Sequence, residues 1–280
     1  MVDRIEESDP NQEQEQERER LRNATPKEEE GLTVEDALLA SLEPLIKDHL
    51  LLEVVRPIKS GKEAAVYLCR ADPSLGQDLV AAKIFRPYER RSFRRDGVYQ
   101  QGRERGARPD AREMRAHSRK TPGGRVRKFD AWISHEMKTL EVLHNAGGDV
   151  PEPYAHHGPV ILMEYIGDKD HPAPILVNQP IEPADAARLY AVILRNVELF
   201  LKHHRVHADL SAFNILLWEE HATIIDFPQA VDPRYNEDAF DLLLRDLVNT
   251  NDYFADRDVE VVDPITHALT IWRKHVDRNR

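Results

Sequence analysis

Three apolar segments near the start of the chain are separated by polar turns, which is typical of β-strands. These segments are residues 54–58, 65–69 and 79–85. The first two are joined by the short polar turn Ser60-Gly61-Lys62-Glu63, and the third follows a turn at 72–76 that contains Pro73 and Gly76. We expect a hairpin from the first two segments and an added strand from the third.

Apolar residues recur every three or four positions in much of the remaining chain, which predicts helices. The first of these helices has a capping signal at Thr33, and the second ends at the pair Gly147-Gly148. The expected elements are helices at 33–45, 128–146, 183–201, 239–254 and 264–275, a buried strand at 159–166, and a hairpin of 215–218 with 222–225 around Glu219-Glu220-His221.

This order of elements predicts an α+β chain with a strand-rich first lobe, a connector and a helix-rich second lobe. Residues 1–31 are rich in Glu, Gln and Arg and have no apolar periodicity, so we expect a disordered acidic tail. The folded domain is then 32–280, with a first lobe at about 50–163 and a second lobe at about 167–280.

Charge is distributed unevenly along the chain. Residues 86–128 hold 15 lysines and arginines against 5 acidic residues, a local net charge of +10 in a chain of net charge −11. This basic insertion contains several glycines, so we expect it to be flexible, and it suits either an anionic partner or simple exposure to solvent. The chain has one cysteine, no apolar run of membrane-spanning length and no signal peptide, so we expect a cytoplasmic protein.

The candidate chemistry centres on the segment His207-Ala208-Asp209-Leu210-Ser211-Ala212-Phe213-Asn214, followed by Asp226. Asp209 can accept a hydroxyl proton or attack phosphorus. Asn214 and Asp226 can supply oxygen ligands for Mg²⁺, which leaves phosphates and water to complete its coordination. A structural alternative is that Asp209 caps a helix and Asn214 fills a turn, but that does not explain why the strand 223–225 delivers Asp226 next.

The first lobe offers complementary residues. Lys83 lies on the third predicted strand, like a lysine that contacts nucleotide phosphates, and Glu136 lies on the following helix, where it can orient Lys83. The turn at Ser60 and Lys62 occupies the place of a phosphate-covering loop, although it has one glycine and is no Walker A motif. Backbone groups of Met163, Glu164 and Ile166 could bind an adenine edge.

Together these residues resemble the RIO family of atypical serine/threonine protein kinases. The resemblance runs in family order from about residue 50 to 256. It rests on Ser60-Gly61-Lys62-Glu63-Ala64, Ala82-Lys83-Ile84, Trp132 with Glu136-Met137, Leu162–Gly167, Pro172-Ala173-Pro174, His207–Ser211 with Asn214, Gln229-Ala230-Val231, and Arg245-Asp246 with Asn249 and Phe254.

The resemblance implies a trimmed two-lobed kinase fold that uses ATP and Mg²⁺ (or Mn²⁺). It implies Asp209 and Asp226 as catalytic residues and Asn214 and Asp226 as metal ligands. It implies an ATP site formed by Ser60, Lys62, Lys83, Glu136, Met163, Glu164 and Ile166. It also implies autophosphorylation on serine, for which Ser92 and Ser118 are candidates, or ATPase turnover through a phosphoaspartate at Asp226.

The chain departs from the family pattern at two places. Ala65 stands where an Asn is common, and Asp226-Phe227-Pro228 replaces the usual metal-binding turn. The first 50 residues are too short and polar for the winged helix that one branch carries, so we expect the branch without it.

The sequence leaves two other functions open. A small-molecule kinase of the aminoglycoside type shares a related His-x-Asp loop but usually adds a larger substrate subdomain. A nucleotide-switched factor that binds ribosomal particles through the basic insertion 86–128 is the other. The protein substrate is unknown, and no membrane contact is expected.

Overall fold

The computed structural model describes residues 33–86 and 122–277, and it divides into two compact units, 1–40 and 41–280. In the first unit, helix α2 (Val34–Ala40) begins with the predicted cap: Asp36 N–H donates to Thr33 Oγ1 at 3.2 Å, and Thr33 N–H donates to Asp36 Oδ2 at 2.8 Å. The expected tail 1–31 and most of the basic insertion, with Ser92 and Ser118, lie outside the described residues.

The single helix expected at 33–45 is wrong. The second unit starts with a separate short helix, α3 (Glu43–Lys47), which has Pro44 in its first turn. Proline has no N–H group and its ring clashes with the preceding turn, so it begins a helix well but cannot lie inside one.

The strands of the first lobe form one antiparallel sheet in the order β1-β2-β3-β5-β4. The predicted hairpin, third strand and buried strand are confirmed. The sequence did not predict β4, because its Pro- and His-containing segment shows no apolar alternation. The bounds are β1 (Leu51–Ser60), β2 (Ala64–Ala71), the short 3₁₀ helix η1 (Pro73–Leu75), β3 (Leu79–Phe85), β4 (Pro153–His157) and β5 (Val160–Glu164).

Helix α6 (Pro122–Asn145) packs against β4 and β5. It begins six residues before the expected start near 128, inside the stretch whose glycines favoured a flexible insertion. Proline is favourable in a first helical turn. Buried Trp132, Glu136 and Leu140 follow one another at four-residue spacing, which places the Glu136 side chain on the face toward the protein interior.

The connector to the second lobe turns sharply at Gly167, which has a φ of 142°. A Cβ atom at this position would lie 2.5 Å from the carbonyl oxygen of His171 and 2.9 Å from Cα of Pro172. A hydrogen bond from Ala173 N–H to Ile166 O closes the turn at 2.9 Å. Only glycine fits this close approach of two backbone segments.

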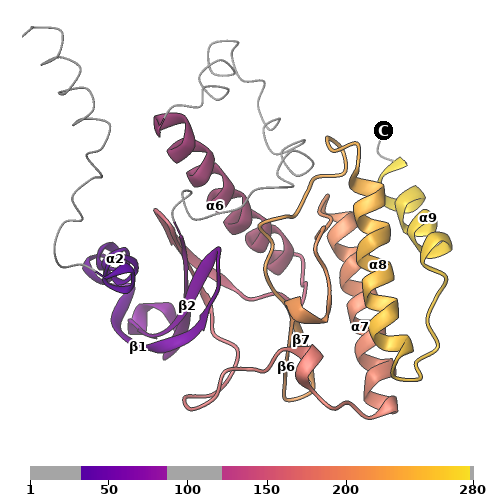
Figure 1. Ribbon diagram of the computed structural model, residues 1–280, viewed down its shortest axis with the longest axis horizontal. Coiled ribbons are helices and arrows are strands. Elements are labelled where there is room, and N and C mark those ends of the chain that lie inside the picture. Colours follow the sequence, from indigo (N-terminus) through magenta and orange to yellow (C-terminus); the bar gives the residue numbers. More distant parts are fainter. Residues whose placement is uncertain (1–32, 87–121, 278–280) are drawn as a thin grey trace, which may run out of the picture. The chain divides into compact units, whose positions relative to one another are not determined.

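Helices dominate the second lobe, where α7, α8 and α9 contact one another (Figure 1). The hairpin turn consists of Glu219 and Glu220 alone, with φ values of 46° and 67°, so His221 belongs to the second strand and not to the turn as predicted. The bounds are η3 (Leu176–Asn178), α7 (Pro183–Lys202), η4 (Ala212–Asn214), β6 (Ile215–Trp218), β7 (His221–Ile224), α8 (Ala239–Ala255) and α9 (Pro264–His275). The three helices predicted here are confirmed.

One apolar core runs through both lobes of the second unit. It includes Phe85 at the end of β3, Phe200 on α7 and Phe227 directly after Asp226, and the rings of Phe200 and Phe227 meet edge to face at 5.6 Å. Burial of Phe227 therefore anchors the segment that carries Asp226. Within 33–86 and 122–277, no helix combines the length and apolar character that a membrane crossing requires.

Candidate active site

The most distinctive group of charges in the described residues joins β3, α6 and the segment after β7. Lys83 Nζ lies 2.6 Å from Glu136 Oε1 and 2.7 Å from Asp226 Oδ1. Lys83 and Glu136 are buried, whereas the Asp226 side chain is 45% exposed. The structure thus brings together three residues that the sequence singles out, with Glu136 and Asp226 lying 53 and 143 positions after Lys83.

The three groups shift one another's pKa. Burial alone would lower the pKa of Lys83, but the carboxylates of Asp226 and Glu136 outweigh it and raise that pKa. Burial raises the pKa of Glu136, against the influence of Lys83. Desolvation would raise the pKa of Asp226 as well, but the Lys83 ammonium holds it below its usual value. Lys83 is therefore a fixed positive charge, and Asp226 is ionised and accessible.

The loop that carries Asp209 is held by α8. The Asp246 carboxylate accepts the N–H of Ala208 at 2.7 Å and the N–H of Leu210 at 2.9 Å. Arg245 donates to the carbonyl oxygen of Ala208, which has a φ of 66°. Burial raises the pKa of Asp246 to about 7. The backbone on both sides of Asp209 is therefore fixed in a conformation that alanine rarely adopts.

Asp246 is a functional candidate that reasoning from individual residues missed. Arg245-Asp246 contributes to the family resemblance, but the sequence gives the pair no role. Nothing in the local sequence of a helix shows that one of its carboxylates serves a loop 36 residues earlier. The remaining signal was the position of an acidic residue among apolar ones: Leu242, Leu243 and Leu247 place Asp246 on the buried side of α8.

His207 links the two loops of the site. Its Nδ1 accepts the N–H of Asp209 at 3.3 Å, so its Nε2 carries the hydrogen that is donated to Ile225 O at 3.1 Å. Burial lowers the pKa of His207 to about 4. The neutral ring also lies 4.7 Å from the ring of Phe227. These contacts agree with a bracing role for His207 between the two loops.

Asp209 and Asn214 lie on the exposed side of this loop. The Asn214 amide donates to the Asp209 carbonyl oxygen at 2.8 Å and closes the loop. Burial, and then the nearby charge of Asp226, raise the pKa of Asp209, so the two carboxylates act on each other across the site. Asp226 has a φ of 73°, a strained value for a non-glycine residue.

Carboxylate and amide oxygens are the ligands that Mg²⁺ prefers. Asp226 is ionised and half-exposed, and Asn214 is partly exposed on the neighbouring loop, so this pair fits a Mg²⁺ that keeps phosphate and water ligands. In the described part of the chain, no group of three or more His, Cys, Asp or Glu side chains is arranged to hold a metal by itself. Two protein oxygens leave most of the Mg²⁺ coordination sphere to phosphate and water.

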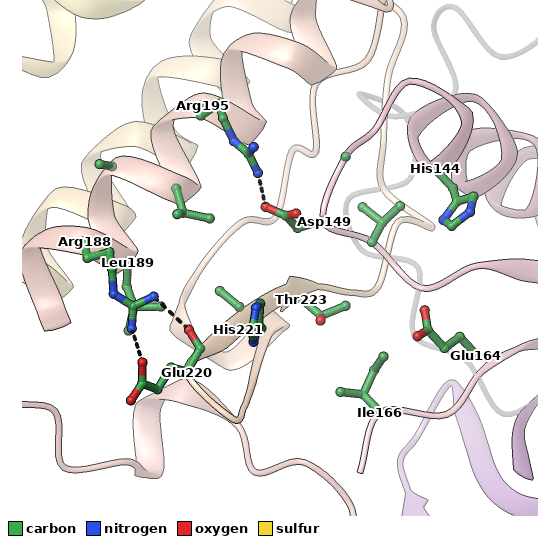
Figure 2. Close-up of a pocket in the computed structure, with 15 residues that line it drawn as sticks. His144, Asp149, Glu164, Ile166, Arg188, Leu189, Arg195, Glu220, His221 and Thr223 are labelled. Atoms are coloured by element: carbon green, nitrogen blue, oxygen red, sulfur yellow. Dashed lines mark hydrogen bonds and ion pairs between the residues drawn. The ribbon is translucent and has the colours of Figure 1, made fainter.

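The connector residues Glu164 and Ile166 line a cavity that is separate from the group of Lys83, Glu136 and Asp226. Its volume is about 660 Å³, and its other walls come from α7, the loop after α6 and the β6–β7 hairpin (Figure 2). Neither Lys83 nor Asp209 lines it. The Glu164 carboxylate accepts the N–H of Glu152 at 3.2 Å, and the Glu164 N–H donates to Glu152 O at 2.8 Å, so this N–H is not available to a nucleotide.

Comparisons with known proteins agree with this geometry. A family model described as the RIO domain matches residues 65–266. A serine/threonine-protein kinase RIO1 from Caenorhabditis elegans is 31% identical over 78% of this chain and 40% of its own length, and a human protein of the same name is 30% identical over 76% and 35%. The chain thus spans less than half the length of these two relatives. A RIO-type kinase Rio1 from Haloferax volcanii is 30% identical over 84% of this chain and 74% of its own length.

Solved structures show the same architecture. The Rio2 kinase of Chaetomium thermophilum, solved as an ADP/Mg²⁺-phosphoaspartate complex, superimposes with a TM-score of 0.63 over 85% of this chain and 67% of its own chain, at 23% identity. This likeness confirms the two-lobed, kinase-like α+β fold expected from the sequence. The family model and the relatives show that the chain belongs to the RIO family.

Proposed function

We propose that this chain is an ATP- and Mg²⁺-dependent atypical serine/threonine kinase of the RIO type. The observation that carries the proposal is the double ion pair of Lys83 with Glu136 and Asp226, beside the braced loop of Asp209. The relatives described above, all named RIO1 serine/threonine or RIO-type kinases, support it.

In this proposal the nucleotide is held mainly through its phosphates. Lys83 uses two of its three ammonium hydrogens on carboxylates, so a third is available for a phosphate oxygen. Glu136 keeps Lys83 in place. Ser60 and Lys62, at the exposed turn between β1 and β2, would contact the triphosphate from the other side. The backbone of Met163, Glu164 and Ile166 would receive the adenine edge.

Asn214 and Asp226 would hold Mg²⁺ or Mn²⁺. A bound divalent ion would neutralise phosphate charge and orient the terminal phosphoryl group. The Rio2 kinase was solved with ADP and Mg²⁺, which supports this assignment by analogy. Lys83 and the metal would share the Asp226 carboxylate, one of whose oxygens already contacts Lys83.

Asp209 is the residue proposed to activate the acceptor. Its raised pKa makes it a better base than an ordinary aspartate, and its exposure lets a serine hydroxyl approach. As the serine oxygen bonds to the γ-phosphorus, the hydroxyl proton goes to Asp209, and the bond between phosphorus and the β–γ bridging oxygen breaks to release ADP.

A hydrolytic route uses the same site. The Asp226 carboxylate, ionised because Lys83 lowers its pKa, would attack the γ-phosphorus and release ADP. Water would then cleave the acyl phosphate to phosphate and aspartate. The Rio2 kinase was solved as a phosphoaspartate complex, which supports this second route by analogy.

The fate of the γ-phosphate tests the proposal. After incubation with γ-labelled ATP and Mg²⁺, we expect label in acid-stable phosphoserine, in an alkali-labile acyl phosphate, or in free phosphate. The first result marks the kinase route, an acyl phosphate marks hydrolysis through Asp226, and free phosphate alone marks hydrolysis without identifying the nucleophile. Label only in an added small alcohol such as an aminoglycoside would contradict a RIO-type kinase, and no consumption of ATP would contradict the whole proposal.

The domain limits and the partner are also proposals. We infer a kinase domain at 32–280, behind an acidic tail at 1–31, in a cytoplasmic protein. The local charge of +10 in 86–128 supports a contact with RNA or a ribosomal particle. Co-sedimentation with ribosomal subunits that weakens as salt rises tests this contact, and co-sedimentation that ignores salt contradicts it.

A further inference from the structure

Arg86, the first residue after β3, fastens the turn between β1 and β2 at three points. Its Nη2 donates to Ser60 Oγ at 2.8 Å, and its Nε donates to Gly61 O at 2.9 Å. Its backbone N–H donates to Glu63 O at 2.8 Å. One residue, three positions after Lys83, thus holds both ends of this turn.

The turn lies beside the strand that carries Lys83. In the sheet, Lys59, the residue before Ser60, is opposite Val66, and Val66 is opposite Lys83, so the side chains of Lys59 and Lys83 lie on the same face of the sheet. A phosphate group bound between the turn and Lys83 would therefore lie near the Ser60 side chain.

The turn has little backbone to offer such a phosphate. Loops with several glycines bind phosphates through successive free N–H groups. Here there is one glycine, and Gly61 N–H already donates to Ala64 O at 2.9 Å. The Gly61 N–H is therefore not available to a phosphate, and side-chain contacts from this turn depend on what holds the side chains in place.

Arg86 restricts the direction of the Ser60 hydroxyl. A hydroxyl oxygen that accepts a hydrogen from a guanidinium must direct its own hydrogen elsewhere. Because Arg86 spans Ser60 Oγ and Gly61 O with a rigid fork, the hydroxyl oxygen is held in place and its hydrogen points away from the guanidinium before a ligand arrives.

We propose that Arg86 is a positioning residue of the nucleotide site, which acts through Ser60 and Gly61 to present the turn to the β- and γ-phosphates of ATP. The inference rests on the proposed function, because it assumes that ATP binds here. It adds a specific role to a residue that no motif singles out.

The test is calorimetric binding of ATP and AMP to the full chain, with kcat and KM measured in parallel. For Arg86→Ala we expect about tenfold weaker ATP binding and a matching rise in KM, with kcat within about twofold of wild type. AMP lacks the distal phosphates, so its affinity should stay unchanged. Arg86→Lys should behave like Arg86→Ala, since an ammonium cannot make both fork contacts. Arg70→Ala is the matched control: Arg70 is an exposed arginine of the same sheet that pairs with Glu53.

A double-mutant cycle separates action through Ser60 from a general effect of charge. Ser60→Ala should weaken ATP binding, and adding Arg86→Ala should weaken it further by much less than tenfold. Fully additive effects, equal weakening of AMP, or an Arg86→Ala protein that matches Arg70→Ala would overturn the inference alone. A wild-type chain that binds no ATP would overturn the proposed function with it.

Discussion

Asp246 fixes the position of Asp209 without touching it: the buried Asp246 carboxylate accepts the backbone N–H groups of the residues on either side of Asp209, at 2.7 and 2.9 Å. The loop between them could otherwise relax, because Ala208 has a positive φ. The geometry of the candidate base is therefore set by a helix whose carboxylate lies 36 to 38 residues after the loop positions that it holds.

Asp246→Asn should lower both stability and ATP turnover, whereas an exposed substitution on the same helix should not. An amide has one acceptor oxygen where the carboxylate has two, so one buried loop N–H loses its partner, at a cost of about 1–3 kcal/mol. We expect a lower unfolding midpoint in urea and at least a tenfold loss of ATP turnover. Asp252→Asn, an exposed substitution on the same helix, is the control and should change neither. Unchanged turnover in Asp246→Asn would contradict the anchoring role.

His207 should give stability a specific pH dependence. The folded protein keeps this ring neutral down to a pKa of about 4, whereas the unfolded chain takes up a proton below about pH 6.5. The unfolded state therefore binds more protons in this window, and the free energy of unfolding falls as pH drops from 6.5 to 4, by up to about 3 kcal/mol from His207.

Asp246 titrates in the same window with the opposite sign. Burial raises its pKa to about 7, so it favours the folded state toward low pH. To separate the two effects, the free energy of unfolding in urea is measured at each pH for wild type and for a His207→Phe variant, and the value for the variant is subtracted from that for wild type. The difference should shrink by about 3 kcal/mol between pH 6.5 and 4, and a difference that is independent of pH would contradict the burial of a neutral His207.

Gly167→Ala should destabilise the connector between the lobes. The added methyl group would lie 2.5 Å from His171 O, in addition to the strain of a φ of 142°. Gly158→Ala is a matched control, with a φ of 51° and no atom within 4 Å of the place that its Cβ would take. We expect about 1 kcal/mol of destabilisation for Gly158→Ala and at least about 2 kcal/mol more for Gly167→Ala, measured by thermal unfolding. Equal losses of stability in the two variants would contradict a cost of the backbone clash at Gly167.

Local signals in the sequence predicted most of the fold. Pro264 at the start of α9 and the apolar spacing of α7 indicated helix bounds that the structure confirms. The errors have local causes: Pro44 divided a helix that its apolar pattern had joined, and the Gly123-Gly124 pair concealed the start of α6. A strand such as β4, paired to β5 but without alternation, depends on its neighbour and is not visible in its own sequence.

The residues of the candidate site were also predicted only in part. Residues whose chemistry is unusual at their spacing, such as Lys83, Glu136, Asp209 and Asp226, could be singled out from the sequence. Residues that support them through backbone contacts could not, because Asp246 and Arg86 become informative only when the loops they hold lie next to them.

The central claim is tested most directly by Mg²⁺-dependent ATP turnover of wild type, Asp209→Ala and Asp226→Asn, with Asp252→Asn as control and unfolding midpoints recorded for all four. We predict turnover that disappears with chelation of the metal, near-complete loss in the first two variants at unchanged fold, and wild-type activity in the control. Full turnover by folded Asp209→Ala and Asp226→Asn proteins would contradict the assignment of this site to phosphoryl transfer.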